Sequence, residues 1–320
     1  MRRLPPRRTV RLMQQLDVAA VRELLGLAGP PADVPVQVVD SVQLDGHRRL
    51  RLQVACPDGD RMPALLLVPD GARGAPGVVV FHQHASRWHL GKSEVCGLAG
   101  DPTQAFGPAL VQAGLIVLAP DAVGFEDRRR CASGTEPHPD DRDQQERELY
   151  YRLVRGQTLA GKVLADAETA LSVLRERPEV APDRTGVVGH SFGGNTVIFH
   201  AAVDERVAFA GTSGAAGTYR NKIAHEIGID RAEVIPGVTD LFDIDDLTRL
   251  ICPRPLGIFA GDSDRYAHDV EAIVDTTRAA YREAESEERF HHHIVSGGHA
   301  LTPERSRSIA DWTIRTAFDT

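Results

Sequence analysis

The type of fold is indicated first by the sequence Thr185-Gly186-Val187-Val188-Gly189-His190-Ser191-Phe192-Gly193-Gly194. Its first residues favour a short buried strand, and the apolar run Asn195–Ala202 has the period of a helix. So tight a turn between strand and helix needs residues without a Cβ two positions to either side of Ser191, and Gly189 and Gly193 meet that need. The pattern therefore predicts a serine at the end of a strand and the start of a helix.

Short aliphatic runs alternate with stretches of helical period along the rest of the chain. Strands that are apolar on both faces and alternate with helices indicate a mostly parallel sheet covered by helices on both sides. We therefore predict an α/β fold with a mostly parallel, eight-stranded sheet. The predicted strands are Leu50–Ala55, Ala64–Val68, Gly77–Phe81, Leu115–Ala119, Thr185–Gly189, Val207–Gly211, Leu256–Gly261 and Phe290–Val295. The predicted helices are Gln104–Ala113, Glu146–Arg177, Asn195–Ala202, Ala267–Glu285 and Pro303–Phe318.

Three connecting segments refine this prediction. The turn Pro57-Asp58-Gly59 indicates that the first strands pair antiparallel. Cys131–Arg147 is rich in Pro, Asp, Arg and Gln, so we expect an exposed excursion before a long helix. Residues 212–250 form an insertion between the sixth and seventh strands, which we interpret either as a lid over a site or as a purely structural excursion.

Composition indicates a folded, acidic protein. The 320 residues are 42% hydrophobic and 26% charged, and 37 basic against 45 acidic residues give a net charge of −8. This length allows one large domain or two smaller ones. Because the chain has no excess of positive charge, we expect no nucleic-acid partner. Only three of the basic residues are lysines: Lys92, Lys162 and Lys222.

The cysteines and the apolar runs bear on the compartment. Cys56, Cys96, Cys131 and Cys252 include no C-x-x-C pair, and a chain this long needs no disulfide to hold a core. No apolar run approaches the roughly 18–20 residues of a membrane helix, and Met1–Arg8 lacks the apolar segment of a secretory signal. We therefore expect a cytoplasmic protein without a membrane partner, and the sequence leaves its oligomeric state open.

Ser191 is the candidate nucleophile, and a serine hydroxyl needs a base and an orienting acid in order to react. Both residue types follow the seventh and eighth predicted strands. These are C-terminal strand ends, where α/β sheets place ligands and catalytic side chains. We predict His299 as the base and Asp264 as the acid, with Asp262 as the alternative acid. Asp264 is preferred because it lies one turn beyond its strand and can reach the loop that carries His299.

Acyl transfer also needs two N–H groups that face the developing oxyanion. We expect one from Phe192 and the second from the backbone of His84 or Gln83, in the loop after the third predicted strand. The side chains of His82 and His84 are expected to be hydrogen-bonded scaffolding rather than substrate contacts.

His291, His292 and His293 compete for the role of base or for a metal. They lie in a predicted strand, where alternate side chains point to opposite faces, so they cannot converge on one ion. We therefore interpret this run as structural, and we predict neither a metal nor a cofactor.

Together these motifs make the chain resemble α/β-hydrolases of the dienelactone hydrolase and acetyl xylan esterase-like group. The resemblance runs from about Leu65 to the C-terminus. It rests on the serine turn, Gly189-His190-Ser191-Phe192-Gly193-Gly194, and on the loop Gly261-Asp262-Ser263-Asp264. The other motifs that carry it are Phe81-His82-Gln83, Gly91-Lys92-Ser93-Glu94, Leu118-Ala119-Pro120-Asp121, Cys252-Pro253-Arg254-Pro255 and Gly297-Gly298-His299. It implies the α/β-hydrolase fold and a triad at the positions of Ser191, Asp264 and His299. Many relatives have His-Gly after the oxyanion strand, where this chain has His82-Gln83-His84, so the second oxyanion donor stays open.

The sequence thus predicts a cytoplasmic serine hydrolase that cleaves a small-molecule carboxylic ester through an acyl-enzyme intermediate. An acyltransferase, a thioesterase or a lactone-handling enzyme of secondary metabolism would use the same residues, and a prolyl-oligopeptidase-like peptidase shares their order. A non-catalytic binding protein on a hydrolase scaffold is the alternative outside the enzymes. Because positions 83, 191, 264 and 299 must meet on one sheet, we expect a single domain over residues 1–320, with residues 1–30 as an N-terminal extension.

Overall fold

A nine-stranded sheet forms the centre of the protein, whose structure is a computed structural model that describes residues 16–320. The strands are β1 (Val36–Leu44), β2 (His47–Ala55), β3 (Arg61–Pro69), β4 (Ala75–Phe81), β5 (Ile116–Pro120), β6 (Val180–His190), β7 (Ala210–Ser213), β8 (Leu256–Gly261) and β9 (Phe290–Val295). Their order across the sheet is β1-β2-β3-β5-β4-β6-β7-β8-β9. The pairs β1-β2, β2-β3 and β3-β5 are antiparallel. The other five pairs, from β5-β4 across to β8-β9, are parallel, which confirms a mostly parallel sheet.

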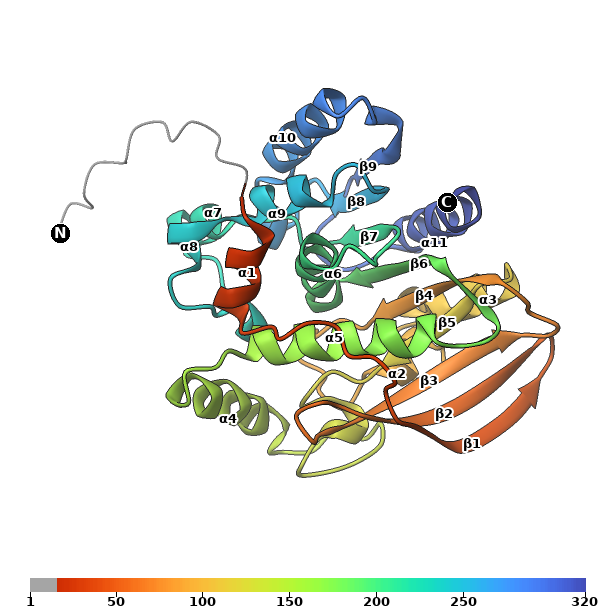
Figure 1. Ribbon diagram of the computed structural model, residues 1–320. Coiled ribbons are helices and arrows are strands. Elements are labelled where there is room, and N and C mark those ends of the chain that lie inside the picture. Colours follow the sequence, from red (N-terminus) through yellow and green to blue (C-terminus); the bar gives the residue numbers. More distant parts are fainter. Residues whose placement is uncertain (1–15) are drawn as a thin grey trace.

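Helices cover both faces of this sheet (Figure 1). They are α1 (Val18–Leu25), α2 (Lys92–Val95), α3 (Phe106–Gln112), α4 (Asp141–Val154), α5 (Leu159–Arg175), α6 (Phe192–Val203), α7 (Tyr219–Ala224), α8 (Val238–Leu241), α9 (Ile244–Ile251), α10 (Val270–Glu283) and α11 (Pro303–Asp319). Val79 and Phe81 of β4 belong to the apolar core on the face that α1, α5, α6, α9 and α10 cover, whereas Val78 and Val80 belong to the core on the opposite face, with α3 and α11. Successive side chains of a strand point to opposite faces, so a strand buried on both faces has a continuous apolar sequence.

The class of fold is confirmed, but the predicted count of eight strands is wrong because Val36–Leu44 forms β1. This strand lies at the edge of the sheet and most of its residues are exposed. A bulge between Val38 and Asp40 also breaks the alternation of its side chains, so the sequence shows no regular strand period. The antiparallel pairing predicted from Pro57-Asp58-Gly59 is confirmed, since Ala55 of β2 lies opposite Arg61 of β3.

The predicted helix Glu146–Arg177 is two helices, α4 and α5. Gly156 has a φ of +71° just after α4, a conformation that suits glycine beyond a helix end. Thr158 then accepts a hydrogen bond from the N–H of Gly161 and caps the start of α5. These two residues carry ordinary stop and start signals within the predicted helix.

The predicted exposed excursion Cys131–Arg147 is wrong in its second half. α4 begins there, and Asp141, Gln144 and Gln145 are buried. Arg129 draws Asp141 inward, since its Nη1 donates to that carboxylate at 2.8 Å. Buried ion pairs of this kind leave no apolar signal in the sequence.

The predicted insertion, residues 212–250, lies between β7 and β8 and contains α7, α8 and most of α9. α9 packs against α6 and α10, and the short 3-10 turn Arg231–Glu233 lies against α5. The insertion therefore covers the helices on one face of the sheet, and its role as a lid stays a prediction. Residues 1–15 of the predicted N-terminal extension lie outside the described residues, whereas α1 packs against α6.

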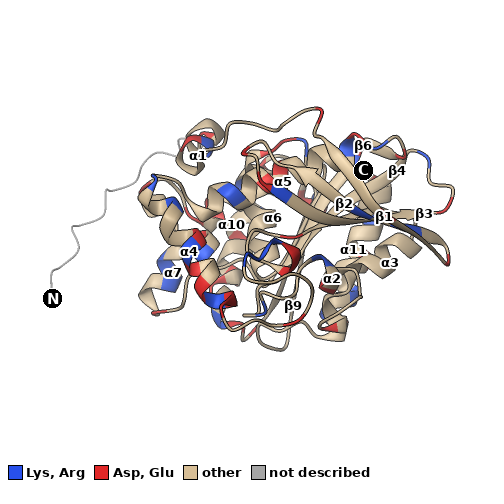
Figure 2. Ribbon diagram, turned by 90° about the horizontal axis from the view of Figure 1, so that it is seen from below, with Lys and Arg blue, Asp and Glu red and all other residues tan. Residues whose placement is uncertain are grey.

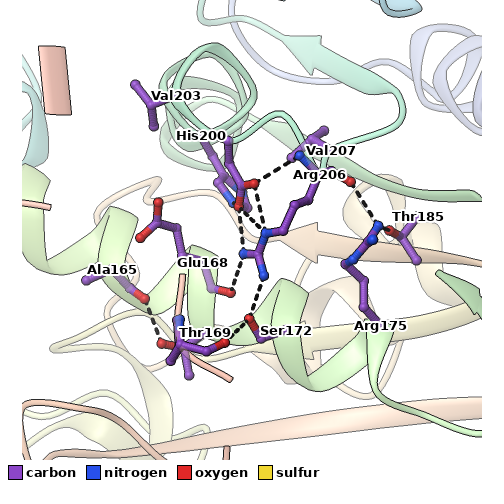
Figure 3. Close-up of polar contacts among 12 residues, drawn as sticks. Ala165, Glu168, Thr169, Ser172, Arg175, Thr185, His200, Val203, Arg206 and Val207 are labelled. Carbon is purple, nitrogen blue, oxygen red and sulfur yellow. Dashed lines mark hydrogen bonds and ion pairs between the residues drawn. The ribbon is translucent and has the colours of Figure 1, made fainter. Parts of the chain in front are cut away.

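Polar contacts join α5 to the chain that follows α6 (Figure 3). Arg206 donates to Asp204 at 2.7 Å and to the Ser172 hydroxyl at 2.8 Å. Asp204 also lies 3.2 Å from Nε2 of His200. Basic and acidic residues lie beside one another along α5 (Figure 2), and Lys162 pairs with Asp166 at 2.9 Å. Of these contacts, the one between Arg206 and Ser172 joins the chain that follows α6 to α5.

Two findings bear on the compartment without deciding it. Cys56, Cys96, Cys131 and Cys252 are all unpaired. Within residues 16–320 no helix combines the length and the apolar character needed to cross a membrane. A cytoplasmic location stays a prediction.

Candidate active site

Ser191 lies at the turn between β6 and α6. Its φ of +57° and ψ of −120° are unfavourable for a residue with a side chain, so the surrounding backbone must hold this conformation. A Cβ on Gly193 would lie 2.2 Å from the carbonyl oxygen of Phe81, and one on Gly189 would lie 2.5 Å from the backbone of Gly193. Glycine at position 189 therefore lets the turn close on itself, and glycine at position 193 lets it fit against the end of β4.

Ser191, His299 and Asp264 form one chain of hydrogen bonds. Ser191 Oγ lies 2.7 Å from Nε2 of His299, and Nδ1 of His299 lies 2.9 Å from Oδ2 of Asp264. The three residues follow β6, β9 and β8, so one edge of the sheet unites distant parts of the chain. Because a carboxylate only accepts, Nδ1 carries the proton and Nε2 is left to accept from the serine hydroxyl.

The two candidate acids have different surroundings. The Asp264 side chain is 0% exposed, and its second oxygen accepts the N–H of Tyr266 at 2.9 Å. Asp262 is exposed and accepts the N–H of Gly297 at 3.0 Å. The structure thus brings Asp264, and not Asp262, to His299. Asp262 instead ties the loop after β8 to the loop that carries the histidine.

Two rings flank His299. The centroid of the Tyr266 ring lies 4.8 Å away, edge to face, and the His190 ring lies 5.2 Å away. Burial lowers the pKa of His190 well below its usual range, so this ring is neutral. A neutral imidazole there adds no positive charge beside His299.

The histidine run of β9 does not converge. The rings of His291 and His293 both lie beside Phe259, whereas His292 contacts Arg278 at 3.0 Å. The alternation predicted for a strand is confirmed, because His291 and His293 share one neighbour while His292 contacts another.

His82 supports the loop after β4. Its Nε2 accepts the N–H of Ala122 at 3.1 Å, so Nδ1 carries the proton and donates to the carbonyl of Gln83 at 2.8 Å. Burial lowers the pKa of His82 to about 4, which keeps the ring neutral. Phe192 begins α6, and N–H groups in a first helical turn have no partner within the helix. Phe192 and either Gln83 or His84 stay the predicted oxyanion donors.

His84 is fixed by a residue that sequence reasoning missed. Its Nδ1 accepts the N–H of Ser86 at 2.9 Å, and its Nε2 donates to Oε1 of Gln145 at 2.8 Å. The indole N–H of Trp88 donates to the same oxygen at 2.5 Å. Gln145 thus orients two rings in the segment after β4. The scaffolding role expected for the His82 and His84 side chains agrees with these contacts.

A buried ion cluster, the Lys92 cluster, holds the segment that follows this loop. Lys92 Nζ lies 2.7 Å from Asp121, 2.5 Å from Glu126 and 2.7 Å from Asp127. The three carboxyl groups are close enough together to ligate a metal ion, but the Lys92 ammonium is bonded to all three. Burial, together with the charge of Glu126, raises the pKa of Asp121 to about 7. The cluster thus joins the end of β5 to α2.

Taken with the strand order, the serine turn and its two partners define the class of protein, an α/β-hydrolase. The model of the dienelactone hydrolase family matches residues 62–231, which is more than half of the chain. The chain therefore belongs to the dienelactone hydrolase family, as the resemblance implies, and it is a carboxylic ester hydrolase.

Individual relatives agree with this membership. YtaP of Bacillus subtilis (strain 168), provisionally named a hydrolase, is 29% identical over 235 residues, 69% of this chain and 72% of YtaP. A Bacteroides fragilis NCTC 9343 structure, provisionally named an acetyl xylan esterase, has a TM-score of 0.70 at 16% identity, covering 87% of this chain and 73% of its own. The glucuronoyl esterase from Solibacter usitatus has a TM-score of 0.66 at 14% identity, covering 94% and 91%. At these identities the solved structures show a shared fold.

Proposed function

We propose that the protein hydrolyses a small-molecule carboxylic ester with Ser191 as nucleophile, His299 as base and Asp264 as the acid that orients it. The continuous hydrogen-bond chain from Ser191 Oγ through both nitrogens of His299 to Asp264 carries this proposal. Such a chain gives the serine hydroxyl an acceptor for its proton and holds the imidazole in the tautomer that can take it.

In the proposed reaction, Ser191 Oγ attacks the ester carbonyl carbon while its proton moves to Nε2 of His299. The carbonyl oxygen becomes negative, and the N–H groups of Phe192 and of Gln83 or His84 stabilise it. The bond to the alcohol then breaks, and His299 returns the proton to the leaving alkoxide. A water molecule attacks the acyl-enzyme by the same route, which releases the acid and regenerates Ser191.

Replacing Ser191 by alanine tests this proposal. We expect Ser191→Ala to fold with a wild-type circular dichroism spectrum and to lose turnover of p-nitrophenyl acetate by about 10⁴-fold or more. It should also lose labelling by a fluorophosphonate probe. Ser263→Ala, a change of an exposed serine in the loop after β8, is the matched control and should keep both. Wild-type turnover or labelling in Ser191→Ala would refute the proposal.

The names of the structural neighbours indicate which esters to try first. Because acetyl xylan esterases and glucuronoyl esterases share the fold, we propose short-chain esters and acetylated sugars as the first substrates to screen. Amides in the same screen separate an esterase from a peptidase. A competing alcohol added to the water separates hydrolysis from acyl transfer, because a transferase would form a new ester.

A further inference from the structure

Arg305, in the first turn of α11, is buried close to the proposed triad. It is 1% exposed and is one of the largest fully buried side chains of the described chain. Its guanidinium donates to three backbone carbonyl oxygens: Nη2 to His299 at 2.7 Å and to Ala300 at 2.6 Å, and Nη1 to Gly298 at 3.1 Å. No carboxylate within residues 16–320 forms an ion pair with it. Arg305 is therefore a buried cation whose hydrogen bonds all go to the loop that carries the base.

This placement is unfavourable by itself. A buried charge without a carboxylate partner destabilises a fold, and a cation in the first turn of a helix faces the positive end of the helix dipole. Burial lowers the pKa of Arg305, and the negative charge of Asp264 opposes that shift. The contacts that offset these penalties are the three to the histidine loop.

The histidine loop needs such a partner. Residues 296–302 link β9 to α11 without regular secondary structure, Gly297 has a φ of +134°, and Gly298 has open space around it. Two successive glycines leave the backbone free to adopt other conformations. Three neighbouring carbonyls that turn to one side require donors spread in space, and a guanidinium presents five N–H groups in a rigid fork.

We propose that Arg305 is a positioning residue that holds His299 between Ser191 and Asp264. The inference rests on the proposed function, because it requires His299 to be the base. The guanidinium binds the backbone carbonyls of Gly298, His299 and Ala300 and so restricts the backbone on both sides of His299. This fixes the position and orientation of the imidazole. The triad partners alone contact only the ring.

The helix gives this clamp a fixed end. Thr302 caps α11 by accepting the N–H of Arg305 at 3.2 Å, and Ser306 donates to the carbonyl of Thr103 at 2.6 Å. α11 also packs against α3. Arg305 therefore connects the loop that carries His299 to a helix that is itself bound to the rest of the protein.

Three variants test the proposal through kcat and KM for p-nitrophenyl acetate, measured well below each melting temperature. Arg305→Gln should lower kcat by about 100-fold, the effect of misplacing a catalytic group by about 1 Å, while KM changes by less than about twofold. Arg305→Lys keeps the charge but not the fork, so its kcat should lie between those of Arg305→Gln and wild type. Arg307→Gln, an exposed change in the same turn of α11, is the matched control and should leave kcat unchanged.

The outcomes separate this proposal from the proposed function. A wild-type kcat in Arg305→Gln, whatever its melting temperature, would show that Arg305 only stabilises the fold and would overturn the inference. If Arg305→Gln does not fold, Arg305→Lys decides: a kcat at least about fivefold below wild type supports the role, and a wild-type kcat overturns it. Activity retained in Ser191→Ala would instead defeat the proposed function itself.

Discussion

Replacing Asp264 by asparagine exploits the two distinct bonds that this carboxylate makes. One oxygen accepts the N–H of Tyr266 and the other accepts Nδ1–H of His299. Asparagine has only one oxygen, and the Tyr266 N–H can pair only with that oxygen, so the NH₂ group must face Nδ1. Nδ1 then becomes the acceptor, the proton moves to Nε2, and Nε2 can no longer take the proton of Ser191. We expect kcat to fall by about 10⁴-fold, which at about 1.36 kcal/mol per tenfold is about 5.4 kcal/mol of barrier.

The matched control is Asp262→Asn, two residues away. Asp262 is exposed and accepts only the N–H of Gly297, which an amide oxygen can accept equally well. Its kcat for p-nitrophenyl acetate should therefore stay within about threefold of wild type. The reasoning is refuted if Asp264→Asn retains more than about a tenth of wild-type kcat, or if Asp262→Asn loses as much as Asp264→Asn.

Three further predictions concern stability. Gly193→Ala should lower the calorimetric melting temperature by about 3–5 °C, because overpacking costs about 2–3 kcal/mol and the entropy of unfolding of a chain this size is roughly 0.7 kcal/mol/K. Gly228 has open space around it, so Gly228→Ala should leave the melting temperature unchanged. Equal shifts in the two variants would contradict the close contact at Gly193. Lys92→Met should destabilise the protein by about 3–5 kcal/mol in urea unfolding, because three carboxyl groups lose a buried partner. Arg282 forms an exposed pair with Glu287, so Arg282→Gln should leave the urea midpoint unchanged. Burial would raise the pKa of Asp127, but its hydrogen bonds, such as that to Lys92, lower it to about 2. Since the folded-state pKa lies below the unfolded value of about 3.9, the stabilisation is present above about pH 4 and is lost as the pH falls toward 2. Asp127→Asn should therefore lose less free energy of unfolding over that pH range than wild type. Parallel curves of unfolding free energy against pH for the two proteins would contradict this prediction.

Local patterns account for what the sequence predicted. Gly189 is required by the backbone of Gly193, four residues away, and Gly193 is required by the distant carbonyl of Phe81. The two glycines still flank Ser191 at a fixed spacing, so the turn could be recognised from a local pattern without the fold. The aliphatic strands could be recognised because the central sheet is buried on both faces. The placement of His299 and Asp264 follows from the rule that parallel strands present their C-terminal ends at one edge.

What could not be predicted depends on distant partners or on solvent. Gln145 meets His84 across 61 positions of sequence, in a segment whose polar composition indicates a solvated loop. Arg305 looks like any surface arginine of a helix, and only its contacts with the histidine loop distinguish it. β1 has no buried face, so neither composition nor period reveals it. The break between α4 and α5 is different, because Gly156 and Thr158 carry signals that a closer inspection of the sequence could have found.

The Lys92 cluster has a consequence for how the protein can be modified chemically. Lys162 and Lys222 are also buried, and like Lys92 they are paired with carboxylates. All three lysines of the chain therefore direct their ammonium groups inward, and arginine carries the exposed positive charge. Reagents that couple to lysine side chains must wait for these clusters to open. The rate of such coupling would then measure local opening of the fold rather than the accessibility of its surface.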